Sequence, residues 1–169
     1  MRGRTGTLRS SERGGAVVEF ALVAPLVFTA LLGAIDMGRL VRISQVSTDV
    51  GRAAASVGAH GFDLAQALQV ARTTKAALGI DEIGIIFVTM VGRKDANDPT
   101  PWVVSQVSGG DLPGFTSRLG EPGGPATLRG IDTLEPGMRL TAVEIAVPFR
   151  PVLPMGSVYP SVVYDVAYF

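Results

Sequence analysis

Glu19 is the residue whose chemistry most needs an explanation, because it is the only charge in an apolar run from Gly15 to Ile35. A carboxylate in the hydrocarbon of a bilayer costs roughly 2–3 kcal/mol on insertion scales. The chemistry open to such a group is ion pairing, because a cationic partner would compensate its charge. An acid close to the start of a helix can also extend to the aqueous interface, and the charge by itself does not separate the two readings.

Other chemistry has little to be built from. The chain has no cysteine and one histidine, His60, so we expect no zinc site and no Ser-His-Asp arrangement. The segment "DANDP" (95–99) lacks the spacing of a calcium loop and predicts a solvated turn. Paired carboxylates do not recur at a spacing that suits acid–base catalysis. We therefore expect that the protein is not an enzyme and that it binds no cofactor and no metal. We assign four aromatic residues to sheet packing: Trp102, Tyr159, Tyr164 and Tyr168.

Charge placement predicts a membrane topology. Residues 1–14 contain four arginines and one acid, and residues 15–35 would span roughly 30 Å as a helix, which is the thickness of a bilayer core. The positive-inside rule places the leader in the cytoplasm and the rest of the chain across the membrane. A removable secretory signal is disfavoured because the apolar region of such a signal has only about 7–15 residues, fewer than the run from 15 to 35. The net charge of zero and the lack of a basic patch disfavour nucleic acid as a partner.

Beyond the apolar run the helical pattern continues with a single apolar stripe, formed by Leu40, Ile43, Val46, Val50, Ala54 and Val57. We predict one helix from about Gly15 to Ala59, amphipathic over 36–59. Pro25 predicts a kink in it, which fits equally a bend used in assembly and an ordinary membrane kink. A second helix follows, with Asp63 and Gln66 as a capping box and Gly79 as its C-terminal glycine. Its predicted apolar face is Leu64, Ala67, Leu68, Ala71 and Leu78.

After Gly79 the apolar period changes from 3.6 to 2, which indicates strands. Four are expected, at 82–93, 101–108, 139–149 and 162–169, with the first in the centre of the sheet and the third alternating between faces. Residues 109–138 are rich in Gly and Pro, and loops of that length are usually functional or mobile. The fold class is therefore α+β, with a long helix and a short helix packed on an antiparallel sheet over 60–169.

The stretch "RGGAVVEFALVAPLVFTALLGAIDMGRL" resembles the TadE-like family of minor pilins of the tight-adherence (Tad/Flp) pilus system, and "RLTAVEIAVPFRPVLP" resembles its C-terminal half. The resemblance implies a pilin-like fold and a basic leader, 1–14, cut between Gly14 and Gly15 by a prepilin peptidase. Glu19 and Phe20 would then be the fifth and sixth mature residues. Glu19 would pair with the N-terminal amine of a neighbouring subunit. TadE and TadF subtypes both fit.

The implied function is assembly, by initiation or capping, of a pilus used in surface adhesion. The implied partners are the prepilin peptidase, other Tad/Flp pilins, the inner-membrane assembly platform and the lipid bilayer. The implied location is the bacterial inner membrane, as a single-pass protein with its C-terminal domain in the periplasm. A permanently anchored periplasmic binding or scaffold domain is the alternative, and it predicts an uncut leader. An exported enzyme is a third hypothesis, for which the residues offer no catalytic constellation.

Overall fold

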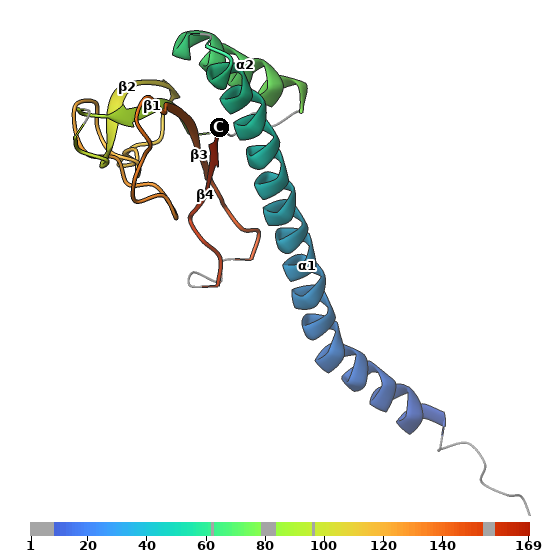
Figure 1. The fold of residues 1–169 in the computed structure, drawn as a ribbon. Helices are drawn as coiled ribbons and strands as arrows, with labels where there is room; N and C mark the ends of the chain where they lie inside the picture. Colours follow the sequence, from blue (N-terminus) through green and yellow to red (C-terminus); the bar gives the residue numbers. More distant parts are fainter. Residues whose placement is uncertain (1–8, 62, 79–83, 96, 154–157) are drawn as a thin grey trace, which may run out of the picture.

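The computed structural model describes residues 9–61, 63–78, 84–95, 97–153 and 158–169, with the backbone alone for 9–13. Two helices come first, α1 (Arg9–Ala59) and α2 (Leu64–Ala77). Four strands follow: β1 (Ile85–Arg93), β2 (Pro101–Gly110), β3 (Leu140–Pro148) and β4 (Val162–Tyr168). The α+β class and the order of the elements are as predicted, although α1 begins at Arg9 rather than at about Gly15 (Figure 1).

The strands form one antiparallel sheet in the order β2-β1-β3-β4, so β1 is an inner strand, as expected. The β1–β2 pairing shifts register between Met90 and Val91, which marks a bulge. After β4, the chain stays beside β3, because Thr141 and Phe169 exchange backbone hydrogen bonds of 2.7 and 2.9 Å.

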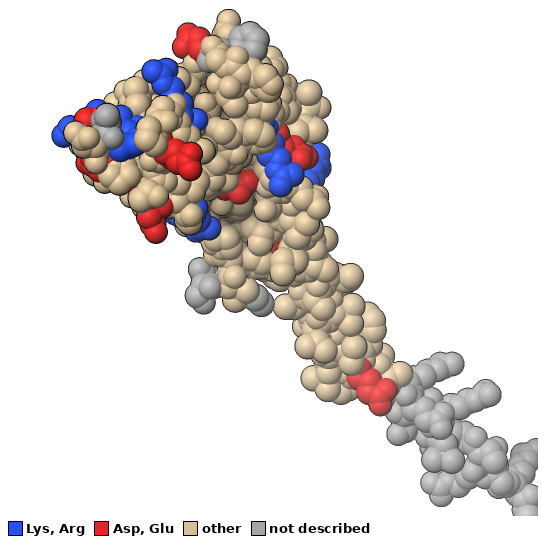
Figure 2. Space-filling view, in the orientation of Figure 1, with Lys and Arg blue, Asp and Glu red and all other residues tan. Residues whose placement is uncertain are grey.

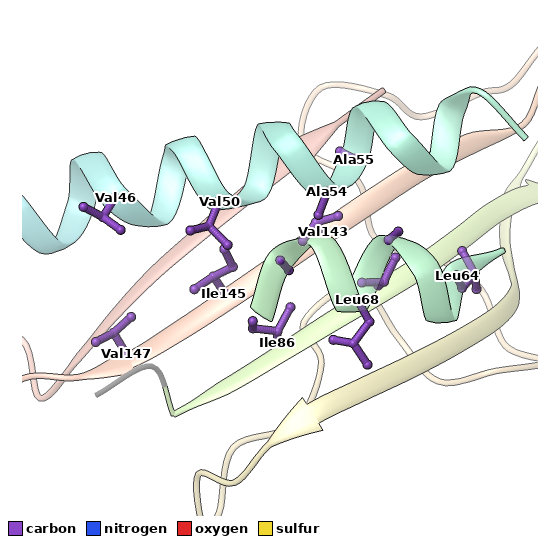
Figure 3. Close-up of a cluster of buried hydrophobic side chains, with 13 residues drawn as sticks. Val46, Val50, Ala54, Ala55, Leu64, Leu68, Ile86, Val143, Ile145 and Val147 are labelled. Carbon is purple, nitrogen blue, oxygen red and sulfur yellow. The ribbon is translucent and has the colours of Figure 1, made fainter. Parts of the chain in front are cut away.

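The C-terminal half of α1 packs on one face of this sheet through the predicted stripe. Val46, Val50 and Ala54 are buried, together with Ile145 and Val147 of β3 and the inner face of α2 (Figure 3). Small residues let the helix approach closely. A Cβ built on Gly51 would lie 3.3 Å from Ala167 Cβ, and one on Gly58 would collide with Thr141 Cγ2. The contact between α1 and the sheet therefore also depends on Gly51 and Gly58, which hydrophobic periodicity does not reveal.

The helix α2 begins where predicted, with Asp63 as its N-cap, but the predicted capping box does not form. Asp63 occupies the N-cap position without a side-chain cap bond, and its carbonyl instead accepts a bond of 2.9 Å from the N–H of Gln66. Four of the five residues of the predicted apolar face are buried. Leu78 is exposed because it lies beyond the end of the helix, as the C-cap. The predicted C-terminal Gly79 lies outside the described residues.

The opposite face of the sheet is also covered. The predicted alternation of β3 between faces is confirmed, because Val143, Ile145 and Val147 lie in the cluster beneath the helices, whereas Leu140 and Ala142 pack on the opposite side. The segment between β2 and β3 supplies Leu119, Leu128 and Leu134 to a second apolar cluster, whose strand residues are Val91, Leu140 and Ala142. Every residue of β3 before Pro148 is buried. Helices, sheet and this segment thus form three layers, with β3 between two cores (Figure 1).

Candidate functional site

The N-terminal half of α1 extends away from the domain and has almost no cover. Phe20, Leu22 and Leu26 are each more than 70% exposed. This half contains an 18-residue apolar window, long enough to cross a membrane, in which no residue is buried. Figure 2 shows it as an uncharged shaft apart from an acidic patch near its lower end. Such an apolar surface is not stable in water, so the helix is a membrane anchor rather than the core helix of a soluble domain.

Glu19 and Phe20 lie next to each other on this exposed helix. Among the residues whose side chains the structure describes, none makes a hydrogen bond or an ion pair with the Glu19 carboxylate. The carboxylate is therefore available to a partner outside the chain, which is the state that an intersubunit ion pair requires. The pairing itself is a prediction from the resemblance.

Gly14 and Gly15 are not required by the packing of the described chain. A Cβ built on either residue would meet nothing within 4 Å. Glycine inside a helix is less favourable than alanine by roughly 0.5–1 kcal/mol, so a glycine pair here weakens the helix without a packing benefit. A reason for these two residues must be sought outside the monomer fold, and cleavage of the leader is the one that the sequence suggests.

Pro25 lies inside α1, which continues through it without interruption. Because proline has no N–H, one intrahelical bond is missing at this position. The hydroxyl of Thr29, one turn after Pro25, donates a bond of 2.8 Å to the Pro25 carbonyl. Figure 1 shows a change of direction in the blue part of α1, where a proline kink is expected. Its role in assembly stays a prediction.

Asp36 has a function in the fold that the sequence did not indicate, since it was read only as the end of the apolar run. Its side chain is fully buried. Oδ1 accepts a bond of 2.8 Å from the N–H of Val152, and Oδ2 accepts one of 2.9 Å from the N–H of Leu153. The guanidinium of Arg39 lies 3.4 Å from Oδ1. One carboxylate thus holds the connection between β3 and β4 against α1.

Further contacts surround this carboxylate, and we call the group of Gly33, Asp36 and Arg39 with residues 149–153 and Tyr159 the helix clamp. The Tyr159 hydroxyl donates a bond of 3.3 Å to the Gly33 carbonyl, and Arg39 donates one of 3.1 Å to the carbonyl of residue 150. The Arg39 guanidinium lies over the Phe149 ring, with its carbon 5.6 Å from the ring centre. The ring centres of Phe149 and Tyr159 are 5.8 Å apart. Tyr159 therefore belongs to the clamp, and its assignment to sheet packing is wrong.

The sequence does contain one signal for the clamp. An acid at the end of an apolar run with Arg39 three residues later places two opposite charges on one helix face. The partners of Asp36 are backbone N–H groups more than 110 residues away, and backbone donors carry no sequence signature. The acid could have been singled out, but its partners could not.

A second buried acid, Glu144 on β3, holds the segment between β2 and β3. It accepts hydrogen bonds from the Ser117 hydroxyl, from the N–H of Arg118 at 2.8 Å and from the Tyr164 hydroxyl at 2.8 Å. Gln106 donates to Ser117 Oγ at 3.0 Å. Burial, followed by the charge and the hydrogen bond of Glu144, raises the pKa of the Tyr164 hydroxyl, which therefore stays a donor.

The remaining candidate residues have local roles. His60 follows the end of α1, with Nδ1 2.6 Å from the Ser56 carbonyl oxygen. Asp95 accepts bonds from the N–H groups of Asn97 and Asp98, as expected of a solvated turn. Trp102 lies on β2 beneath Lys94, whose Nζ is 4.6 Å from the ring centre. Within the described ranges, no three His, Asp or Glu residues come together in a way that could hold a metal ion.

Comparison with known proteins gives a match in the N-terminal part of the chain. The family model described as TadE-like protein matches residues 14–56. No curated protein and no solved structure matches the chain significantly. The matched segment begins at Gly14 and includes Glu19, Pro25 and Asp36, so it covers the membrane anchor and most of the amphipathic half of α1. The resemblance to the TadE-like family is therefore confirmed over residues 14–56.

Proposed function

We propose that this protein is a minor pilin or pseudopilin that takes part in the assembly of a Tad/Flp pilus used in surface adhesion. The observation that carries the proposal is the family match, which supports a minor-pilin-like protein associated with a Tad pilus. The match starts at Gly14, the residue before the proposed cut. The proposed role is assembly, by initiation or capping, and it is not enzymatic.

The exposed anchor supports the same proposal. Its apolar surface and the Glu19 carboxylate, which has no partner among the described side chains, are features that a neighbouring helix can use, because an ion pair in a low-dielectric environment is strong and specifies an axial offset. After cleavage, the amine of Gly15 in one subunit would meet Glu19 in the next. The proposed partners are a prepilin peptidase, other Tad/Flp pilins and the inner-membrane assembly platform. The proposed topology has the leader in the cytoplasm and the sheet domain in the periplasm.

Cleavage can be tested by intact-mass measurement of the protein extracted from membranes of cells that contain the peptidase. We expect loss of residues 1–14. Gly14→Leu should retain the leader, whereas Gly38→Leu should be processed normally. Gly38 is a matched control because it lies on the same helix and, like Gly14, has no atom within 4 Å of a built Cβ. An intact leader in the wild-type protein would contradict the proposal and favour a permanently anchored domain.

The ion pair can be tested separately. Glu19→Ala should insert in the membrane at the wild-type level, because it removes a costly charge, but pilus formation should be impaired. Val18→Ala is the control, since it truncates an exposed neighbour without touching the charge. Pili counted by electron microscopy give the readout. Wild-type piliation in Glu19→Ala would refute the pairing while leaving cleavage untouched.

A further inference from the structure

The described parts of the connection between β3 and β4, residues 149–153 and 158–161, lie beside α1 on the side of the membrane anchor (Figure 1). They are held there by the helix clamp, through the bonds from Val152 and Leu153 to Asp36 and from Tyr159 to Gly33. These helix positions mark the end of the apolar run, which reaches Ile35. The depth of this part of the domain relative to a bilayer is therefore fixed by the helix.

That depth can be worked out from helix geometry. The run from 15 to 35 has 21 residues, and at 1.5 Å per residue it matches a hydrocarbon core of about 30 Å. Gly33 is three residues before Asp36, so its carbonyl lies about 4.5 Å further toward the membrane centre. The Tyr159 hydroxyl that bonds to it lies at the boundary between hydrocarbon and headgroups. The neighbouring residues lie in the headgroup region.

The surface of the connection suits that environment. Val152 is 53% exposed and Val158 is 65% exposed, although both are apolar. Tyrosine is enriched at membrane interfaces because its ring is apolar and its hydroxyl is polar. Arg150 is exposed and Arg39 is partly exposed, so guanidinium groups are present at the level where lipid phosphates lie. At an interface the apolar side chains of these two valines would be removed from water.

We infer that the described ends of this connection, residues 149–153 and 158–161, form a second membrane contact, in which Val152, Val158 and Tyr159 insert into the headgroup region of the bilayer that α1 crosses. Lipid is the occupant because the patch is continuous with the anchor and is held at its boundary by the helix clamp. The contact restricts the tilt of the domain on the membrane surface. The inference depends only on the membrane anchor and not on cleavage or pilus assembly.

The chain has no cysteine, so a single introduced cysteine can carry an environment-sensitive fluorophore without further changes. Full-length protein would be reconstituted in vesicles of phosphatidylcholine and phosphatidylglycerol. Val158→Cys probes the proposed contact, and Val152→Cys is a second probe at the same level. Phe28→Cys reports on the anchor itself. Val104→Cys on β2 is the matched aqueous control, because Val104 is a similarly exposed valine at 51% and lies on the far edge strand.

Quenching by aqueous iodide and by lipids with nitroxides at the headgroup or deep in the acyl chain gives the depth of each probe. For the probe at Val158 we expect at least about threefold less iodide quenching than at Val104 and the strongest quenching by the headgroup nitroxide, because interfacial insertion buries roughly 5–10 Å. Phe28 should respond most to the deep nitroxide. Iodide quenching at Val158 equal to that at Val104 would overturn the inference. So would shielding from iodide without nitroxide quenching, which would indicate a protein partner.

Discussion

Replacement of Glu144 by glutamine should release the segment between β2 and β3 while leaving the helices and the sheet in place. The carboxylate is fully buried and accepts three hydrogen bonds, two of them from Ser117 and Arg118 in that segment. Glutamine has nearly the same shape but only one acceptor oxygen, and it carries no charge. Both the N–H of Arg118 and the Ser117 hydroxyl then lose a charged acceptor, and one of the two faces an NH2 group in place of an oxygen.

The magnitude follows from the number and kind of these bonds. A hydrogen bond to a charged group contributes about 1.5–3 kcal/mol, against about 0.5–1.5 kcal/mol for a neutral pair. Converting the bonds in the segment to neutral ones therefore lowers the free energy of its local opening by about 1–3 kcal/mol. At about 1.4 kcal/mol per tenfold change, amide exchange in residues 111–129 should become roughly 5- to 150-fold faster.

Hydrogen–deuterium exchange with mass spectrometry on the full chain in detergent micelles measures this directly. Glu135→Gln is the matched control, because Glu135 is an exposed acid in the same segment and should leave exchange unchanged. Exchange in α1 and β1 should stay at the wild-type rate. Unchanged exchange in residues 111–129 would refute the role given to Glu144, and so would a uniform increase over all elements, which would point to global destabilisation.

Two further predictions concern α1. Gly58→Val should lower the free energy of unfolding by about 1–3 kcal/mol, because its Cβ collides with Thr141. The control Gly38→Val has open space around the new side chain and should change the free energy of unfolding by less than about 1 kcal/mol. Thermal unfolding in detergent compares the two variants. Asp36→Ala should leave two backbone N–H groups without their acceptor and so speed amide exchange in residues 149–153, but not in β1. Unchanged exchange there would refute the helix clamp.

The elements of this protein could be predicted from the sequence because their signals are local. The apolar run and its stripe fixed the course of α1, and the change of period after Gly79 separated helices from strands. The family resemblance rested on the same N-terminal residues and was confirmed over 14–56. These signals come from neighbours in the chain, where hydrophobic periodicity and capping residues act directly.

What the sequence did not reveal depends on contacts between distant segments. Glu144 was read only as one residue of an alternating strand, and an acid in such a strand normally faces water. It is buried because the Gly- and Pro-rich segment, with few local signals, folds over that face and provides the donors. Asp36 was missed for a similar reason, because its donors are backbone groups of a remote connection. Tyr159 was misplaced because its hydroxyl bonds to a helix carbonyl.

The helix clamp also covers one side of α1 and leaves the others open. From Gly33 to Arg39 it occupies one side of the rod, while Ile35, Met37 and Val41 on other sides stay exposed. A second helix lying alongside the anchor can therefore follow it freely up to about residue 32, but farther along it must approach from the uncovered flank. The position of the domain therefore determines on which side of α1 a neighbouring helix can pack.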